Sequence, residues 1–93
     1  MYYRIRVTDY TENTKTPEPT EARVKTLVQA YRSQEEAAEH GWTVIAALAA
    51  LSGLDYENQG DQYMAYYREG HPCAGLGAYT VEIIDENNNP QDL

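Results

Sequence analysis

The sequence predicts an α+β domain, in which a four-stranded antiparallel sheet carries one helix packed across one face. Three observations lead to this fold class. Residues 33–53 place apolar side chains at helical spacing between a capping serine and a terminal glycine. Stretches on both sides of that helix alternate apolar and polar residues, which is typical of strands with one buried face. Turn-forming residues separate the stretches into the order ββαββ, and residues 1–93 are long enough for a single domain.

The predicted helix has start and stop signals at its ends. Ser33 is a good N-cap residue, and Glu36 completes a capping box three residues later. Gly53 suits the left-handed position that follows the last turn. We expect one continuous helix, and the alternative is a break at His40-Gly41. The face expected to be buried comprises Ala37, Gly41, Val44, Ile45, Leu48 and Leu51, with Ala38 and Ala49 at its margin.

The strands are predicted from alternation along the chain. In the first strand Tyr3, Ile5 and Val7 alternate with Arg4 and Arg6. Residues 21–32 are also compatible with a helix, but the β-branched residues in this stretch favour a strand. In residues 61–69 both faces of the expected strand carry Tyr or Met, so neither face is plainly solvated. The expected strands are residues 2–9, 21–32, 61–69 and 76–86.

The remaining residues are predicted to connect these elements. Two prolines mark a long loop over residues 10–20. Residues 54–60 are polar and turn-prone, so we expect an irregular connection there. The sequence GHPCAG at residues 70–75 predicts a turn. Polar residues end the chain, so a frayed tail is expected over residues 86–93.

The charge distribution argues against two kinds of partner. The formal net charge is −8, and residues 54–93 carry eight of the fifteen acids but one of the seven bases. Such a field repels nucleic acid and anionic membranes, whereas it attracts basic protein surfaces. The sequence has no apolar run of membrane-spanning length and no recognisable signal peptide, and its lone Cys73 cannot form an internal disulfide. We therefore expect a cytoplasmic protein, in the host cytoplasm if a phage encodes it, that contacts neither membrane nor nucleic acid directly.

Two surface features have open interpretations. Arg4, Arg6, Arg23 and Lys25 form a basic stripe that suggests a platform for single-stranded nucleic acid, but cross-strand acids are expected to pair with it. Trp42 lies beside the apolar face of the helix. It is predicted either to plug the edge of the core or to anchor a partner.

The sequence contains no complete catalytic or metal-binding motif. It has no phosphate loop, no dinucleotide fingerprint, no H-E-x-x-H and no C-x-x-C. A zinc site of His40, His71, Cys73 and a carboxylate is conceivable, as is Cys73 acting as a nucleophile, but neither has a local signature. Residues 55–60 approach a calcium loop, yet Tyr66 stands where the bidentate glutamate is needed. We expect neither an enzyme nor a bound cofactor or metal.

The remaining signal is the acidic, tyrosine-rich second half of the chain. The aromatic residues are nine Tyr, one Trp and no Phe, and Tyr suits contact surfaces because it carries a polar tip on an apolar body. Acids beside such rings steer a basic partner and set its register. The alternative is a solvated acidic rim that only confers solubility. The predicted partner-binding residues are Asp55, Tyr56, Glu57, Asp61, Tyr63, Tyr66, Tyr67, Glu69, Glu82, Asp85 and Glu86.

In size, acidity and expected fold, the chain resembles anti-CRISPR proteins, the small inhibitors that phages encode against host defence. The resemblance includes no motif, so it carries over no site residues. It implies a non-catalytic inhibitor that binds a basic nucleic-acid-handling complex, such as a CRISPR effector, and blocks access of the nucleic acid. The second hypothesis is a homo-oligomeric structural or accessory domain that associates through a Tyr-bearing sheet.

Overall fold

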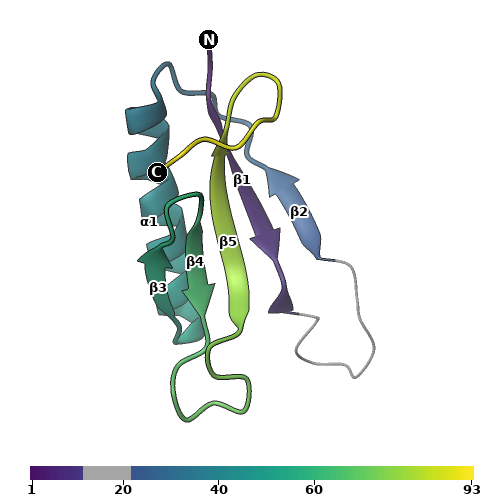
Figure 1. Cartoon of the computed structure of the whole chain (residues 1–93), viewed down its shortest axis with the longest axis vertical. Coiled ribbons are helices and arrows are strands. Elements are labelled where there is room, and N and C mark those ends of the chain that lie inside the picture. The colour runs from purple at the N-terminus through teal and green to yellow at the C-terminus, as the bar shows by residue number, and fades with distance from the viewer. Residues whose placement is uncertain (12–21) are drawn as a thin grey trace.

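The fold is that of a computed structural model, which describes residues 1–11 and 22–93 of the chain. Most of the loop expected over residues 10–20 lies outside the described residues. The elements follow one another in the order ββαβββ (Figure 1). They are β1 (Arg4–Asp9), β2 (Arg23–Thr26), α1 (Gln34–Ser52), β3 (Asp55–Asn58), β4 (Tyr63–Tyr66) and β5 (Gly77–Ile84).

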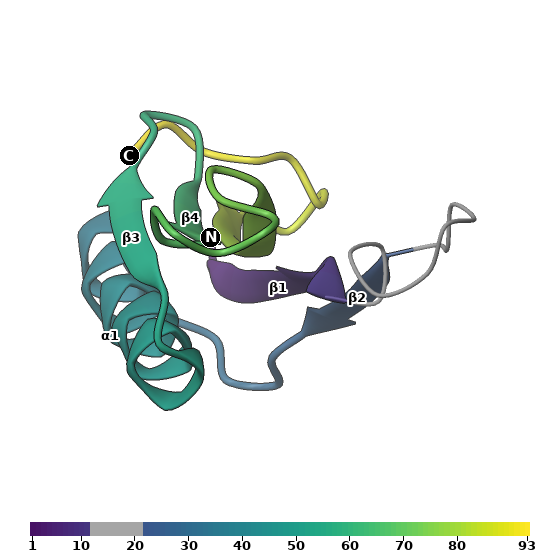
Figure 2. The same cartoon turned by 90° about the horizontal axis from the view of Figure 1, so that it is seen from below.

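Within the described residues, five strands form one antiparallel sheet in the order β2-β1-β5-β4-β3. The α+β class and the packing of a helix on the sheet are confirmed, but the expectation of four strands is wrong. The additional strand is β3, which lies where a polar connection was expected. Its residues, DYEN, are all exposed, so no apolar alternation marks them in the sequence. β2 and β3 form the two edges of the sheet (Figures 1 and 2).

α1 begins and ends at the residues that the capping signals predict. The Ser33 side chain accepts a hydrogen bond from the Glu36 backbone N–H at 3.1 Å. Gly53 ends the helix in the left-handed conformation, with φ 66°. The helix runs through His40-Gly41 without interruption, which confirms the expectation of one continuous helix.

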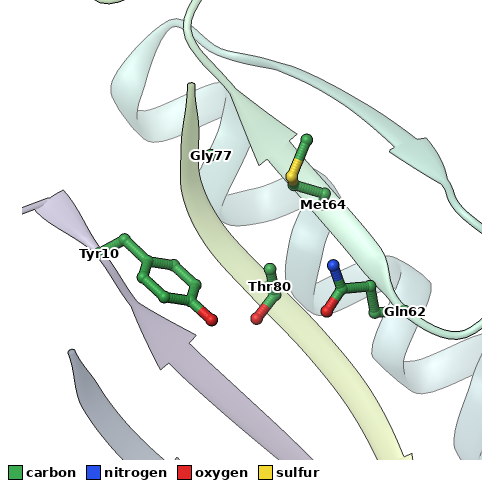
Figure 3. Close-up of a pocket in the computed structure, with 5 residues that line it drawn as sticks. All are labelled: Tyr10, Gln62, Met64, Gly77 and Thr80. Atoms are coloured by element: carbon green, nitrogen blue, oxygen red, sulfur yellow. The ribbon is translucent and has the colours of Figure 1, made fainter. Parts of the chain in front are cut away.

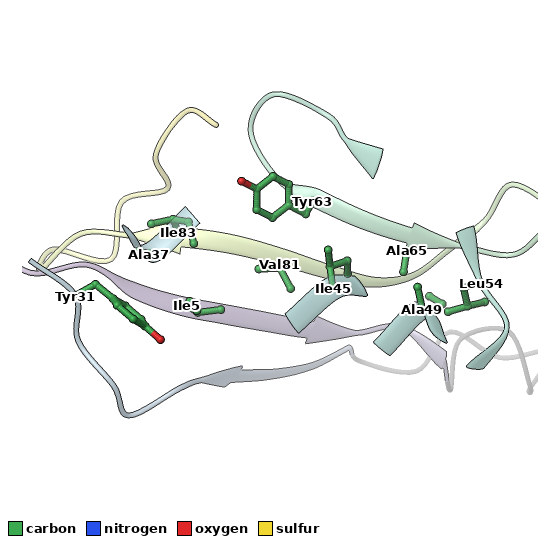
Figure 4. Close-up of a cluster of buried hydrophobic side chains, with 11 residues drawn as sticks. Ile5, Tyr31, Ala37, Ile45, Ala49, Leu54, Tyr63, Ala65, Val81 and Ile83 are labelled. Atoms are coloured by element: carbon green, nitrogen blue, oxygen red, sulfur yellow. The ribbon is translucent and has the colours of Figure 1, made fainter. Parts of the chain in front are cut away.

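The core lies between α1 and the face of the sheet that β1, β5 and β4 form (Figure 4). Small residues on the helix allow a close approach, because a Cβ added to Gly41 would lie 3.0 Å from Ile83 Cδ1. Leu51 was expected to be buried, but it is 86% exposed. It lies about 200° around the helix from the buried Ala49, so it faces away from the sheet. The buried helix residues are Ala37, Gly41, Ile45 and Ala49.

β2 is shorter than the predicted strand over residues 21–32. The strand ends at Thr26, although the Leu27 N–H still donates to the Ile5 carbonyl at 2.8 Å. The chain pairs with the N-terminal segment again at Tyr31, which exchanges two hydrogen bonds of 2.8 Å with Tyr3. The other three predicted strands are confirmed over shorter ranges. The predicted antiparallel pairing of the first two strands is also confirmed.

The helix does not cover the β2 side of the sheet. α1 lies mainly over β5, β4 and β3, so β2 stays outside the main core. Val24 lies opposite Thr8, on the face of the sheet away from α1, and both Val24 and Val28 face solvent, although their alternation indicates a buried face. A groove of about 380 Å³ remains between α1 and the β1–β2 pair. Its lining residues are Val7, Asp9, Arg23, Val24, Lys25, Leu27, Val44, Leu48 and Tyr79.

The C-terminal segment folds back on the sheet. Gln91 N–H donates to the Ile83 carbonyl at 2.8 Å, and Leu93 N–H donates to the Gly60 carbonyl at 2.7 Å. The Leu93 side chain packs against the core. The sequence predicts a frayed tail over residues 86–93, whereas these contacts fix the segment beside β5 and the β3–β4 turn. Because these hydrogen bonds join backbone groups, the polar side chains of the segment give no indication of them in the sequence.

Candidate functional site

β3 is held on the sheet by a tight hairpin. Gln59 N–H donates to the Gln62 carbonyl at 2.8 Å, which leaves Gly60 and Asp61 as a two-residue loop. Gly60 takes φ 95°, a conformation that favours glycine, and its N–H donates to Asn58 Oδ1 at 2.7 Å. A Gly-Asp pair between two strand-like segments is a hairpin signal, and it could have identified β3 from the sequence.

The two faces of β3 carry different chemistry. Tyr56 pairs with the buried Ala65 of β4 and therefore lies on the helix side of the sheet. Asp55 and Glu57 lie on the opposite face, where Glu57 is directly opposite Met64. Among the described strands, β3 is at the edge of the sheet and has a neighbour on one side only. The result is an open strand edge with an aromatic residue on one face and two carboxylates on the other.

An exposed aromatic pair stands at this edge. The Trp42 ring lies 4.9 Å from the Tyr56 ring, and each residue is 39% exposed. Trp42 also meets the buried Tyr63 ring edge-on at 5.0 Å. The expectation that Trp42 packs at the edge of the core is confirmed, whereas its role as an anchor for a partner stays a prediction. Trp42 belongs with the candidate site, although the set of site residues chosen from the sequence did not include it.

Within the described residues, basic side chains neutralise few of the acids at this edge. Asp55 Oδ1 accepts a hydrogen bond from Arg68 Nε at 3.0 Å, in a pair that is half exposed. Within residues 1–11 and 22–93, no ion pair involves Glu57 or Asp61. Glu39 adds a carboxylate beside Trp42, where an open hollow of about 430 Å³ lies on the helix surface. A positively charged group can therefore approach most of these acids without breaking an ion pair that the described residues already make.

The structure gathers only part of the predicted site at the β3 edge. Asp55, Tyr56 and Glu57 lie on β3, and Asp61 lies in its hairpin loop. The other predicted tyrosines are less accessible. Tyr63 is 7% exposed within the core, and burial raises its pKa. Tyr66 and Tyr67 are half-buried, and the Tyr67 ring stacks on His71 at 4.4 Å.

The C-terminal acids of the predicted set mostly make internal contacts. The Glu82 carboxylate pairs with Arg6 at 3.0 Å across neighbouring strands. Asp85 accepts hydrogen bonds from the N–H groups of Asn89 and Asn87, and these bonds lower its pKa. The Glu86 side chain accepts from the Tyr2 N–H at 2.7 Å. Glu69 is exposed in the β4–β5 connection.

Both histidine rings and the backbone of the cysteine make local contacts. His71 Nδ1 accepts a hydrogen bond from the Cys73 N–H at 2.9 Å, and His40 stacks on Tyr31 at 4.8 Å. Among the described residues, no three His, Cys, Asp or Glu side chains are grouped as metal ligands would be. Residues 55–60, which approach a calcium loop in sequence, form β3 and the start of its hairpin turn instead.

The basic stripe considered as a nucleic-acid platform is divided between the two faces of the sheet. In the strand register Arg23 lies opposite Asp9 and Lys25 lies opposite Val7, so both basic residues are on the helix side. Arg4 and Arg6 lie on the other face. The alternation of β2 was assigned to the wrong face, because its exposed valines resemble a buried stripe.

A small hollow lies on the face of the sheet away from α1 (Figure 3). Tyr10 reaches over β5 toward Thr80, and the missing side chain of Gly77 leaves room for the Met64 sulfur. The hollow measures about 280 Å³. Its lining residues are Tyr10, Gln62, Met64, Gly77 and Thr80, which include no carboxylate, imidazole or thiol. This lining offers no acid–base pair for catalysis.

Comparison with protein-family models, with curated proteins and with solved structures gives no match for this chain. In the described part of the chain, no helix has both the length and the apolarity needed to cross a membrane.

Proposed function

We propose that this chain is a non-catalytic binding protein that uses the β3 edge to hold a basic protein surface. The β3 edge comprises Asp55, Tyr56, Glu57 and Asp61 together with Trp42 of α1. The observation that carries the proposal is the combination of an open strand edge, acids without full compensation and an exposed Trp–Tyr pair. Aromatic anchors contribute most of the affinity of an interface, and surrounding charges accelerate and orient the encounter.

The partner that fits this edge carries lysine or arginine. We propose a nucleic-acid-handling complex such as a CRISPR effector, because its nucleic-acid channel is a basic surface of the kind that an acidic chain with net charge −8 would occupy. Binding there would exclude the nucleic acid by occupying its site. The function is then inhibition by competition, and it needs no cofactor.

The test is a competition assay with purified CRISPR effector complexes. Anisotropy of a fluorescent target nucleic acid reports its binding to each complex as this protein is added. We expect at least one complex to lose its nucleic acid, and the inhibition to weaken as salt rises, because exposed charges are screened within about 10 Å at 0.1 M salt. If no complex is inhibited at low salt, the effector hypothesis is wrong.

Two charge variants locate the surface. Asp55→Lys/Glu57→Lys reverses two acids of the β3 edge, and Glu35→Lys/Glu36→Lys makes the same change in charge at exposed positions in the first turn of α1. Each pair reverses two charges, so the net charge rises from −8 by four units in both variants. The β3 variant should inhibit at least about tenfold less strongly than the control variant, since like charges then face each other. Equal inhibition by the two variants would show that net charge acts and the β3 edge does not.

A further inference from the structure

The two edges of the sheet carry opposite charges. β2 reads RVKT and β3 reads DYEN, and every residue of both strands is exposed. They lie at opposite ends of the sheet, so one molecule cannot pair its own edges (Figures 1 and 2). Within the described residues, no ion pair involves Arg23 or Lys25. A second copy of the chain would supply the missing neighbour to each edge.

The backbone groups on the two edges are in matching phase. Leu27 N–H donates to the Ile5 carbonyl, so every second residue of β2 bonds to β1, and Val24 points its N–H and C=O outward. The bond from Gln59 N–H to Gln62 sets the same alternation in β3, where Tyr56 points its groups outward. An antiparallel partner requires outward groups opposite outward groups.

We infer that β3 of one copy pairs antiparallel with β2 of a second copy, with Tyr56 opposite Val24. This register satisfies the outward backbone groups of both residues. It also brings together two exposed apolar side chains, since Val24 is 60% and Tyr56 39% exposed. Pairs of aromatic and β-branched residues across strands are favourable in sheets.

The same register aligns all the charges of the two strands. Asp55 lies opposite Lys25, and Glu57 lies opposite Arg23. For β3 to meet β2 in antiparallel fashion, the second copy must be turned over, so the helices of neighbouring copies lie on opposite faces of the joined sheet. Asp55 and Glu57 lie on the face away from their own α1, and Arg23 and Lys25 lie on the face toward theirs. The turn therefore brings the acids and the bases onto one face.

The inferred contact is head-to-tail and small. Each copy keeps one free edge, so further copies can add to the joined sheet. A contact of one short strand buries less than a standard interface, so association should require high concentration. The inference goes beyond the proposed function and needs no effector. A basic partner and a second copy would compete for β3.

The experiment is sedimentation velocity from micromolar to millimolar protein at low and high salt. We expect the mean mass of the wild type to rise with concentration beyond that of a dimer, and to fall when salt is added. Asp55→Lys/Glu57→Lys and Arg23→Glu/Lys25→Glu should each stay monomeric at concentrations where the wild type associates. The Glu35→Lys/Glu36→Lys control should associate like the wild type.

Mixing the two edge variants provides the sharpest outcome. The first variant has two basic edges and the second has two acidic edges, so neither pairs with itself but each fits the other. An equal mixture should recover the mass increase that both lack alone. Val24→Pro offers a test without charge change, because the lost N–H points away from β1, and this variant should associate at least tenfold more weakly.

Several results would overturn the inference. A wild type that stays monomeric throughout would contradict it, as would a closed dimer that adds no further copies. Edge variants that associate as strongly as the wild type would also contradict it. Circular dichroism confirms that each variant is folded. Failure of the mixture to associate would leave the effector competition assay unaffected, so the two proposals fail separately.

Discussion

Replacement of Gly41 by alanine tests how closely the helix packs on the sheet. Helix propensity alone predicts that Gly41→Ala stabilises the protein by about 1 kcal/mol. The structure predicts the opposite sign, because the new Cβ would lie 3.0 Å from Ile83 Cδ1 and 3.2 Å from Val81 Cγ1. Both neighbours are fully buried, and the short Val81 side chain has no flexible end that could move aside.

The expected magnitude follows from two opposing contributions. Forcing an extra methyl group into a packed core costs about 1–3 kcal/mol. Subtracting the gain in helix propensity leaves a net loss of roughly 1 kcal/mol. In a domain of this size that loss lowers the midpoint of thermal unfolding by about 4–8 °C. Urea unfolding followed by circular dichroism measures the change in the free energy of unfolding.

A double-mutant cycle identifies the contact. Ile83→Val removes the Cδ1 atom nearest to the new methyl group and should alone cost about 0.5–1.5 kcal/mol. In the Gly41→Ala background it should cost less, with a coupling of about 0.5–1 kcal/mol. Ala50→Gly at the exposed helix surface is the propensity control, with an expected cost of about 1 kcal/mol. Stabilisation by Gly41→Ala, with additive effects in the cycle, would refute the close packing described here.

Three further predictions concern stability. Burial raises the pKa of Tyr63 above 10.0, so the stability that Tyr63 contributes is full below pH 10 and is lost as pH rises through the pKa of the folded state. In thermal melts above pH 10, the Tyr63→Phe variant should therefore lose less stability than the wild type. Hydrogen bonds from Asn89 and Asn87 lower the pKa of Asp85 below 3.8, so the stability that Asp85 contributes is present above that pH and is lost as pH falls through the pKa of the folded state. Asp85→Asn should be less stable than the wild type at neutral pH, and the difference should shrink when thermal melts are made in acid. Ile45→Ala should cost about 2–5 kcal/mol in urea unfolding, whereas Leu51→Ala should change stability by less than about 0.5 kcal/mol because Leu51 is exposed.

The parts of the fold that local signals specify were predictable from the sequence. Ser33 and Gly53 mark the ends of α1 through side-chain and backbone chemistry that acts within one turn. The inward positions of β1 and β5 show clear alternation, because both strands lie in the middle of the sheet beneath the helix. Burial on one face thus leaves a pattern that the sequence reveals.

The edge strands were harder to predict because burial does not constrain them. β3 has no apolar alternation, and its one local signal is the Gly-Asp hairpin loop. In β2 Val24 suggests a buried face, but it lies on the face of the sheet away from α1 and is exposed. The position of Leu51 was also missed, because the buried stripe follows i, i+4 steps that drift around the helix.

The candidate site could be predicted only in part for the same reason. Composition drew attention to Asp55, Tyr56 and Glu57, and the structure places these three residues together on β3. It could not separate them from acids such as Glu82 and Asp85, because their partners are distant in sequence or lie in backbone turns. Whether this edge binds a partner stays a prediction.

The central claim is that the β3 edge is an open strand that a basic partner covers. Residue-resolved amide hydrogen exchange tests it most directly, in the free protein and after addition of an inhibited effector complex. We expect the outward Tyr56 and Asn58 amides to exchange quickly in the dilute free protein, while the Glu57 amide, which faces β4, is protected. Addition of the complex should then protect the Tyr56 amide. A Tyr56 amide that is already protected in the free protein, or that exchanges unchanged in a bound complex, would contradict the account.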